Sequence, residues 1–161
     1  MRILLATEGS EFSQAALDKC CDIFRSVKDV EILILSVADP VFVPVGPFSV
    51  SAAYSAEADQ AVMEIATQAV TIAEKELRRV FSELGTPLTT KVVKGRPAQA
   101  IVEEAENWGA DLIVLGSHGY GFWQRTFLGS VSSAVVHHAP CSVLIVRPSD
   151  EYGQNGSRSH E

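Results

Sequence analysis

The sequence predicts an α/β fold, a doubly wound, open sheet of five parallel strands in the order 3-2-1-4-5 with helices on both faces. Short apolar runs at residues 3–6, 30–37 and 112–115 are typical of strands buried on both faces, and they alternate with longer segments of helical periodicity. That alternation indicates right-handed βαβ units. Residues 89–94 alternate apolar with polar side chains, which suits an edge strand and places it at one end of this order.

The first strand, residues 3–6, leads into a helix. Ser10 has a side chain suited to cap that helix at its N-terminus. Apolar residues at spacings of three and four predict its buried stripe, which comprises Phe12, Ala16, Cys20, Ile23 and Val27. Residues 30–37 then form the second strand.

Residues 40–56 contain several prolines and a glycine and predict a long loop, which is either a lid or binding loop or simply variable surface. Residues 57–84 carry the longest helical pattern, and Gly85 and Pro87 end it. The predicted inward face of this helix comprises Val62, Ile65, Ala69, Ile72, Ala73, Val80 and Leu84.

The second half of the chain continues the alternation. A helix at residues 97–108 follows the edge strand, with a proline at its first position and Gly109 after its end. Residues 112–115 form the fourth strand, residues 130–138 a helix and residues 142–146 the fifth strand. The inward residues predicted for the two helices are Ile101, Ala105 and Trp108, and then Val131, Ala134, Val135 and His138.

The length of 161 residues predicts a single domain, residues 1–148, followed by a polar tail, residues 149–161, that we expect to be disordered. The net charge of −7 argues against nonspecific nucleic-acid binding, which needs a basic face. The chain shows no targeting leader and no apolar run near the ~18 residues of a membrane span, so we expect a cytoplasmic protein with no membrane partner. The cysteines are odd in number, and we expect Cys20, Cys21 and Cys141 to be small buried hydrophobes.

Glycines and serines cluster after the fourth strand. Gly116-Ser117-His118-Gly119 ends that strand, and Gly129-Ser130-Val131-Ser132 opens the next helix. Glycines allow close backbone approach, and the first N–H groups of a helix attract anions. The pattern therefore predicts a phosphate cradle, or else only a tight turn and a capped helix. In the predicted sheet the order reverses between strands 1 and 4, so Thr7 and Glu8 end beside the cradle, where open α/β sheets bind ligands.

Other nucleotide and catalytic motifs are missing. No Walker A sequence is present, and Gly119-Tyr120-Gly121 lacks the third glycine of a dinucleotide fingerprint. Ser117 and His118 suggest a nucleophile and base, but we expect adjacent side chains at a strand end to diverge, and no acid is placed to orient the histidine. We therefore predict no catalytic residue.

The spacing Gly116-x2-Gly119-x9-Gly129-Ser130 resembles the nucleotide motif of the universal stress protein family. Five further stretches are similar to that family in the same order along the chain; they are residues 3–10, 35–40, 95–97, 110–115 and 141–148. Together with the motif, the resemblance covers roughly residues 1–148. The resemblance implies the same Rossmann-like sheet, of the adenine nucleotide alpha hydrolase type, and the nucleotide-binding subtype of the family.

By resemblance, the chain binds ATP or another adenine nucleotide and acts as a stress-response regulator, with Mg²⁺ carried by the phosphates and no metal site of its own. Ala6, Thr7 and Glu8 would flank adenine and ribose, and the backbone of Val37 would meet adenine. The residues implied around ribose and phosphates are Gly116, His118, Gly119, Gly129, Ser130, Val131 and Ser132.

One position departs from the family pattern. Glu8 stands where nucleotide-binding members usually have aspartate, and its carboxylate reaches about one methylene, ~1.5 Å, further, which a tight site can feel. Arg125 either reaches a phosphate or is solvated. Two alternatives to a nucleotide-dependent regulator stay open, a slow ATP hydrolase and a stress scaffold that binds no nucleotide.

The fifth strand predicts a homodimer. Val143, Leu144, Ile145 and Val146 form an apolar run on an edge strand, and native proteins normally protect such an edge. A second copy pairing antiparallel about a two-fold axis would satisfy it. The alternative is a monomer in which this strand is internal or is hidden by residues 40–56.

Overall fold

A computed structural model of the chain describes residues 1–40, 52–119 and 128–148. It contains one sheet of order β3-β2-β1-β4-β5, in which every neighbouring pair of strands is parallel. The predicted fold class and strand order are therefore confirmed, with β3 and β5 at the edges. The strands are β1 (Arg2–Ala6), β2 (Glu31–Ala38), β3 (Leu88–Lys94), β4 (Leu112–Gly116) and β5 (Ser142–Val146).

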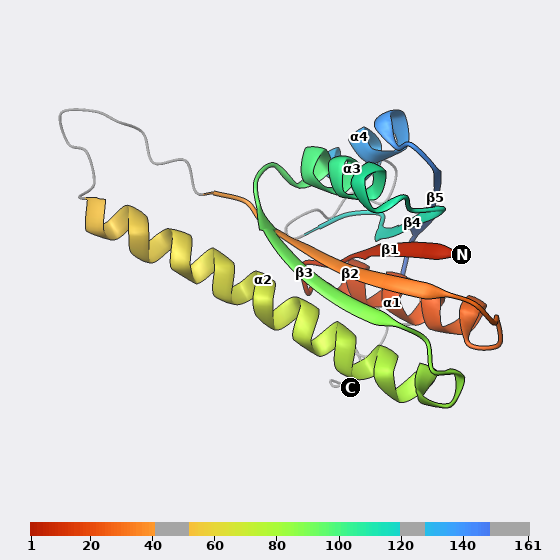
Figure 1. Ribbon diagram of the computed structural model, residues 1–161. Helices are drawn as coiled ribbons and strands as arrows, with labels where there is room; N and C mark the ends of the chain where they lie inside the picture. Colours follow the sequence, from red (N-terminus) through yellow and green to blue (C-terminus); the bar gives the residue numbers. More distant parts are fainter. Residues whose placement is uncertain (41–51, 120–127, 149–161) are drawn as a thin grey trace, which may run out of the picture.

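The helices form a layer on each face of the sheet (Figure 1). α1 (Glu11–Phe24) and α2 (Ala52–Phe81) cover one face, and α3 (Pro97–Trp108) and α4 (Ser130–His138) cover the other. Successive strand residues enter different halves of the core, because side chains alternate across a strand. Ile3 and Leu5 pack beneath α1 and α2, and Leu4 packs beneath α3 and α4.

α1 begins as expected, with the Ser10 hydroxyl accepting a hydrogen bond from the backbone N–H of Ser13 at 3.3 Å. Its predicted stripe is partly wrong, since Ile23 is 45% exposed and Val27 lies beyond the helix end. Phe24 is buried in place of Ile23. Because each residue advances a helix by about 100°, a prediction that is off by one residue selects a different face. The side chains that are buried are Ser13, Ala16, Leu17, Cys20, Cys21 and Phe24.

α2 begins earlier than predicted. Residues 52–56, expected in a loop, are helical, and the rest of that loop from residue 41 lies outside the described residues. Ile65 and Ile72 were predicted to be buried, but they are 53% and 55% exposed. The alanine that follows each isoleucine faces the sheet instead, which brings the helix close to the strands. The inward face comprises Ala66, Ala69, Val70, Ala73, Leu77 and Phe81.

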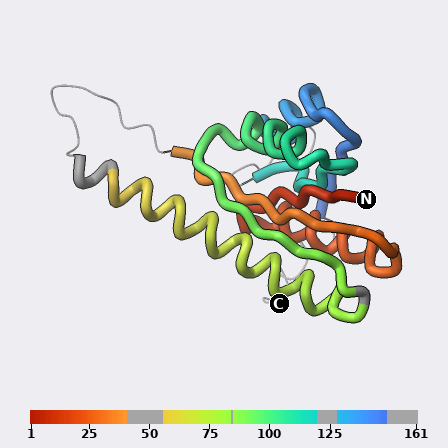
Figure 2. The backbone as a smooth tube through the Cα atoms, in the orientation of Figure 1, coloured from red at the N-terminus to blue at the C-terminus, as the bar shows by residue number. Residues whose placement is uncertain are grey.

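α2 is much longer than the strands it covers. Its 30 residues span about 45 Å, whereas the eight residues of β2 span about 26 Å. Its N-terminal turns therefore project past the carboxyl edge of the sheet (Figures 1 and 2). Lys94, at the end of β3, ties this projection to the sheet through an ion pair with Asp59, 3.2 Å from nitrogen to oxygen. A 3₁₀ turn, η1 (Ser82–Leu84), and left-handed Gly85 at φ 62° then return the chain into β3.

The second half follows the prediction closely. α3 has Pro97 in its first turn and left-handed Gly109 at its end, and Ile101 and Ala105 are buried. α4 buries Ser132 and Val135, whereas His138, predicted on its inward stripe, is exposed because it lies in the last turn. The predicted tail, residues 149–161, lies outside the described residues. Within the described residues no helix is both long and apolar enough to cross a membrane.

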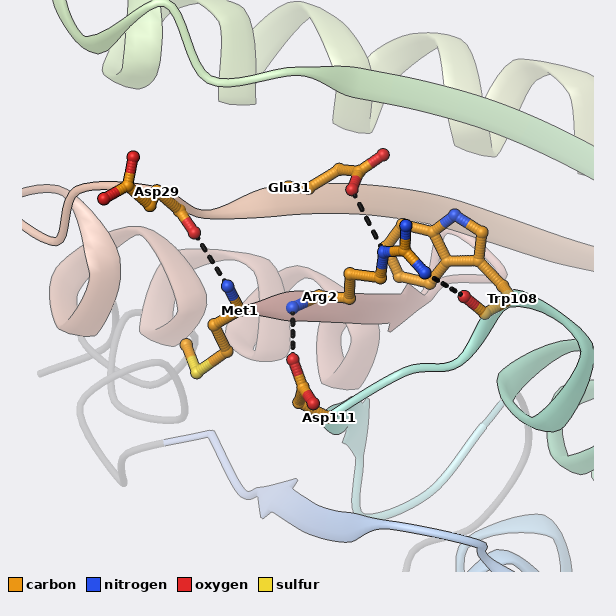
Figure 3. Close-up of polar contacts among 6 residues, drawn as sticks. All are labelled: Met1, Arg2, Asp29, Glu31, Trp108 and Asp111. Atoms are coloured by element: carbon orange, nitrogen blue, oxygen red, sulfur yellow. Dashed lines mark hydrogen bonds and ion pairs between the residues drawn. The ribbon is translucent and has the colours of Figure 1, made fainter.

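The amino edge of the sheet is closed by side chains (Figure 3). The Arg2 guanidinium donates to Glu31 Oε2 at 3.2 Å and to the Trp108 carbonyl at 3.0 Å, and it lies 5.7 Å from the Trp108 ring centre. The backbone N–H of Arg2 donates to Asp111 Oδ2 at 2.7 Å. These contacts join β1 to β2 and to the α3–β4 turn, so the side chains at the amino edge stabilise the fold.

Candidate functional site

The carboxyl ends of β1 and β4 meet at the middle of the sheet. The chain leaves β1 for α1 on one face and leaves β4 for α4 on the other, so the strand order reverses between them. Leu5 is in register with Val114, which places Thr7 beside Gly116 two residues further along. This is the position at which open α/β sheets form a ligand crevice.

Gly116 lacks a side chain because α1 lies against it. A Cβ atom there would be 2.7 Å from the backbone carbon and oxygen of Phe12. The Phe12 ring also packs on the His118 ring, with the centroids 5.2 Å apart. We interpreted the glycine from sequence as an opening for a ligand, but its position shows that α1 packing by itself requires it.

The two halves of the glycine motif touch each other directly. The backbone N–H of Gly129 donates to the Ser117 carbonyl at 2.8 Å. The Ser132 hydroxyl lies 2.8 Å from the carbonyl oxygen of Gly116 and 3.1 Å from that of Ser117, and donates to them. Ser132 is buried, so its proton holds the start of α4 onto the end of β4. A Cβ atom at Gly129 would lie 3.2 Å from both the Ser117 oxygen and His118 Cα, which leaves room for little more than glycine.

The first turn of α4 has no side-chain cap within the described residues. Its N-cap is Gly129, in extended conformation, and its first turn carries no acidic residue. The first N–H groups of a helix have no partner within the helix and carry partial positive charge. Ser130, the first helical residue, is exposed, so an anion can approach here.

Hydroxyl groups at the start of α1 hydrogen-bond to one another and to the neighbouring backbone. The Ser13 hydroxyl accepts from the Gly9 N–H at 3.1 Å and from the Thr7 hydroxyl at 3.2 Å, and it donates to the Ser10 carbonyl at 3.0 Å. Thr7, Ser10 and Ser13 are all buried. The Thr7 hydroxyl is thus turned toward α1 and bonds within the start of that helix.

Glu8 reaches across the crevice from the end of β1. Its carboxylate accepts a hydrogen bond from the Ser10 hydroxyl, and a Cβ atom at Gly119 would lie 3.7 Å from Glu8 Oε1. Burial raises the pKa of the Glu8 carboxyl, and the hydrogen bond from Ser10 opposes that rise. The glutamate side chain, which is longer than that of aspartate, therefore brings a carboxylate to the glycine-rich end of β4.

The expectation that Ser117 and His118 diverge is wrong. Ser117 Oγ lies 3.1 Å from His118 Nδ1, within hydrogen-bond distance. Ser117 is only 1% exposed, however, so its hydroxyl does not reach a substrate in this conformation. The pair joins the strand end to its loop.

The remaining predicted residues lie around the same edge. Ala6 is buried in the core beneath α3 and α4, in register with Leu35 of β2, and Val37 is partly buried two residues further along. Val131 is partly buried against the same core. Arg125 lies outside the described residues.

Sequence reasoning missed what Ser13 and Phe12 do at this edge. Ser13 stands three residues after the N-cap serine, and that spacing is a signal that could have identified its part in the first turn. The contact of Phe12 with Gly116 joins distant parts of the chain and leaves no local signal.

Comparison with known proteins identifies relatives over almost the whole chain. The sequence profile of the universal stress protein family matches residues 1–147. Universal stress protein MJ0531 of Methanocaldococcus jannaschii is 33% identical over 147 residues, which cover 91% of this chain and 81% of the relative.

Solved structures share the fold. Universal stress protein UspA from Lactobacillus plantarum superposes with a TM-score of 0.75 at 26% identity, covering 91% of this chain and 97% of the other. A universal stress protein in complex with cAMP gives a TM-score of 0.60 at 25% identity, covering 92% and 98%. An Arabidopsis thaliana family protein with AMP bound gives 0.62 at 18% identity, covering 97% of each chain, which shows a shared fold.

Proposed function

The chain belongs to the universal stress protein family, and from that membership and its own geometry we propose that it binds an adenine nucleotide in the crevice between β1 and β4. The observation that carries the proposal is the first turn of α4, which lacks a side-chain cap within the described residues and lies directly on the glycine-rich end of β4. The universal stress proteins solved with cAMP and with AMP support adenine nucleotides as the ligand class.

The phosphates would lie at the N-terminus of α4. There the backbone N–H groups of Ser130, Val131 and Ser132 and the exposed Ser130 hydroxyl offer donors. Within the described residues no cluster of three or more histidine, cysteine or carboxylate side chains could hold a metal, so Mg²⁺ would arrive on the phosphates of ATP.

The nucleoside would extend from the phosphates toward the middle of the sheet. Glu8 and Gly119 lie beside each other across the crevice, where they would flank the ribose. The ends of β1 and β2 adjoin, so the backbone of Thr7 and Val37 would meet the adenine.

The consequence for function is a nucleotide-dependent switch. A bound nucleotide would contact both the end of β1 and the start of α4, and it would favour the conformation in which these two segments are held together. Slow ATP hydrolysis is the second candidate, although Ser117 is buried away from any substrate. Mass spectrometry of ligand released from the purified protein separates the switch from a scaffold that binds none, and phosphate release over hours tests hydrolysis.

Ser130→Asp is the sharpest test of the phosphate position. A carboxylate in the first turn of α4 favours the helix dipole but repels a phosphate, so the free energy of unfolding should be unchanged or higher while AMP and ATP affinity fall about tenfold or more. Gly129→Val is less informative, because a Cβ there presses on the Ser117–His118 backbone whether or not a ligand binds.

The matched control is Ser130→Asn, which has the shape of aspartate without its charge and should retain most of the affinity. Adenosine, which has no phosphate, should bind both variants equally in calorimetry. Unchanged AMP affinity in folded Ser130→Asp would refute the phosphate position.

We also propose that two copies pair through β5. Val143, Leu144 and Ile145 are only partly buried on this edge strand, and Val146 is buried. The Val146 carbonyl accepts from the Ser117 N–H toward β4 at 2.8 Å. Backbone groups of successive strand residues turn to opposite sides, so Ile145 turns its N–H to the free edge, where a second β5 could pair antiparallel.

Ile145→Pro tests this pairing, because it removes the outward N–H while leaving the hydrogen bonds to β4 intact. Sedimentation should show that the contact is lost, with circular dichroism unchanged. Leu144→Lys, which puts a charge on the same edge, should act in the same direction. Assembly indifferent to both changes would exclude β5 as an interface.

A further inference from the structure

The outer side of α2 carries a stripe of exposed side chains that the fold does not use. Ile65 and Ile72 are 53% and 55% exposed, and they stand seven residues apart, in the same column of the helix. Ala61, Gln68 and Lys75 are also exposed, and with the two isoleucines they form a series at alternating spacings of four and three residues. That spacing is the seam of a helix that packs lengthwise on another helix.

The exposed charges of α2 are divided along its length. Glu57 and Glu64 lie in the first half, and Lys75 and Arg79 lie in the second half, all four exposed. None of these four side chains has an ion pair among the residues that the structure describes.

The carboxylates of the helix differ in their partners, and Glu64 accepts only a hydrogen bond from the neutral side chain of Gln60, one turn earlier, at 3.1 Å. Asp59 pairs with Lys94, Glu74 pairs with Arg78, and Glu76 accepts a hydrogen bond from Gln14 of α1. The charges that have no ion pair among the described residues therefore make the stripe acidic at one end and basic at the other.

We propose that α2 docks antiparallel along the α2 of a second copy of this chain, about a two-fold axis near Gln68. In that arrangement Ile65 of each copy packs near Ile72 of the other. The acidic first half of each helix lies opposite the basic second half of the other, with Glu57 near Arg79 of the second copy. A parallel arrangement would place like charges together, so the charge division selects the antiparallel one.

The architecture leaves room for this contact. α2 lies over β2 and β3 at one side of the sheet, and β5 forms the opposite edge (Figure 1). The N-terminal turns of α2 project beyond the sheet, so a second helix can run beside them. Because the α2 contact and the β5 contact lie on different sides, each can form without the other, and together they build a closed tetramer or an open chain.

Disulfide trapping tests the position of the axis. Gln68→Cys should give a reducible, covalent dimer of the full-length chain under mild oxidation, because the two thiols meet near the axis. Thr67→Cys is the matched control, exposed and adjacent but turned about 100° away, and it should give little product. Cys20 and Cys21 are buried and do not compete, and Cys141→Ser removes the remaining thiol from both variants. Equal yields, or none from Gln68→Cys, would overturn the proposal.

Charge reversal tests the direction of the helices. Glu57→Lys with Glu64→Lys should weaken the association about tenfold or more in sedimentation equilibrium, and adding Lys75→Glu with Arg79→Glu to the same chain should restore it. Ile65→Lys with Ile72→Lys should reduce the assembly to a monomer if β5 does not pair, and to a dimer if it does. If the preceding segment, residues 41–51, covers this stripe within one chain, or if the helices run parallel, the reversal and its rescue fail and the proposal is wrong.

Discussion

α1 and α4 both begin at the carboxyl edge of the sheet, on either side of one crevice, and their first turns are built in opposite ways. The first turn of α1 is closed by the hydroxyls of Ser10, Ser13 and Thr7. The first turn of α4 has glycine at its N-cap and no side-chain cap within the described residues.

The difference comes from where the serines stand. In α1 a serine occupies the N-cap, so its oxygen turns back onto the helix and accepts from Ser13. In α4 the N-cap is Gly129 and the first serine is one position later, where its hydroxyl cannot cap the turn. The serine at the third position, Ser132, is drawn down onto β4. In α1 the Ser13 N–H has a side-chain acceptor and the hydroxyls around it bond to one another, which holds the fold together. In α4 the first N–H groups have no side-chain acceptor among the described residues, and they can receive an anion.

Gly116→Ala should have the largest effect on stability, because it breaks the contact between β4 and the first turn of α1. The new methyl group would lie 2.7 Å from the Phe12 backbone, so α1 must move, and we expect a loss of about 3 kcal/mol in the free energy of unfolding. Urea denaturation measures it. Gly119→Ala, where the new carbon only touches Glu8 at 3.7 Å, should change stability by less than about 0.5 kcal/mol. Equal losses would show that α1 packing is not the reason for Gly116.

Ser13→Ala against Ser130→Ala compares the two helix starts directly. Removing the Ser13 hydroxyl leaves the Thr7 hydroxyl without its acceptor and leaves the Gly9 N–H with only the longer bond to Thr7 Oγ1 at 3.3 Å, and it should cost about 2 kcal/mol. Ser130 is exposed, and its loss should cost less than about 0.5 kcal/mol in the free protein. Thermal unfolding without nucleotide measures both. A comparable cost at Ser130 would mean that its hydroxyl makes hydrogen bonds as important to stability as those of Ser13.

Glu8→Gln should have the smallest effect, and its sign depends on pH. Burial raises the pKa of the native Glu8 carboxyl above its ordinary 4.5, so at neutral pH the ionised group costs the native state stability. That cost disappears as the pH falls through the native pKa toward 4.5. Glutamine should therefore raise the melting temperature at pH 7, and the gain should vanish near pH 4.5.

The control for this prediction is Glu11→Gln, an exposed carboxylate in the first turn of the same helix. It removes a favourable charge at a helix N-terminus and should not stabilise the protein. A pH-independent gain from Glu8→Gln would contradict the burial argument.

Much of the fold could be predicted from the sequence, because continuous apolar runs mark buried parallel strands strongly. Helix faces were harder. At Ile65 and Ile72 the larger side chain suggested burial, but a neighbouring alanine allowed α2 to approach the sheet more closely. Ser13 was not predicted to be buried, since hydrophobic periodicity does not identify polar residues that have partners inside.

The location of the candidate site was also predictable, since topology and the glycine motif both lead to the ends of β1 and β4. The roles of single residues were not. Whether the Ser132 hydroxyl faces a ligand or the Gly116 carbonyl depends on how α4 lies on β4. That geometry follows from tertiary packing, which a local pattern does not contain.

The length of α2 has a consequence for how the molecule opens. Among the described residues of this helix, full burial begins only at Ala66, and the earlier turns rest on partly buried contacts and the exposed Asp59–Lys94 ion pair. Amide hydrogens should therefore exchange with solvent progressively faster from Leu77 back toward Glu57. Those near Leu77 exchange through global unfolding, and those near Glu57 exchange through local opening of the helix end. A neighbour seated on the projecting turns would flatten that gradient, so exchange rates along this one helix would report its occupancy.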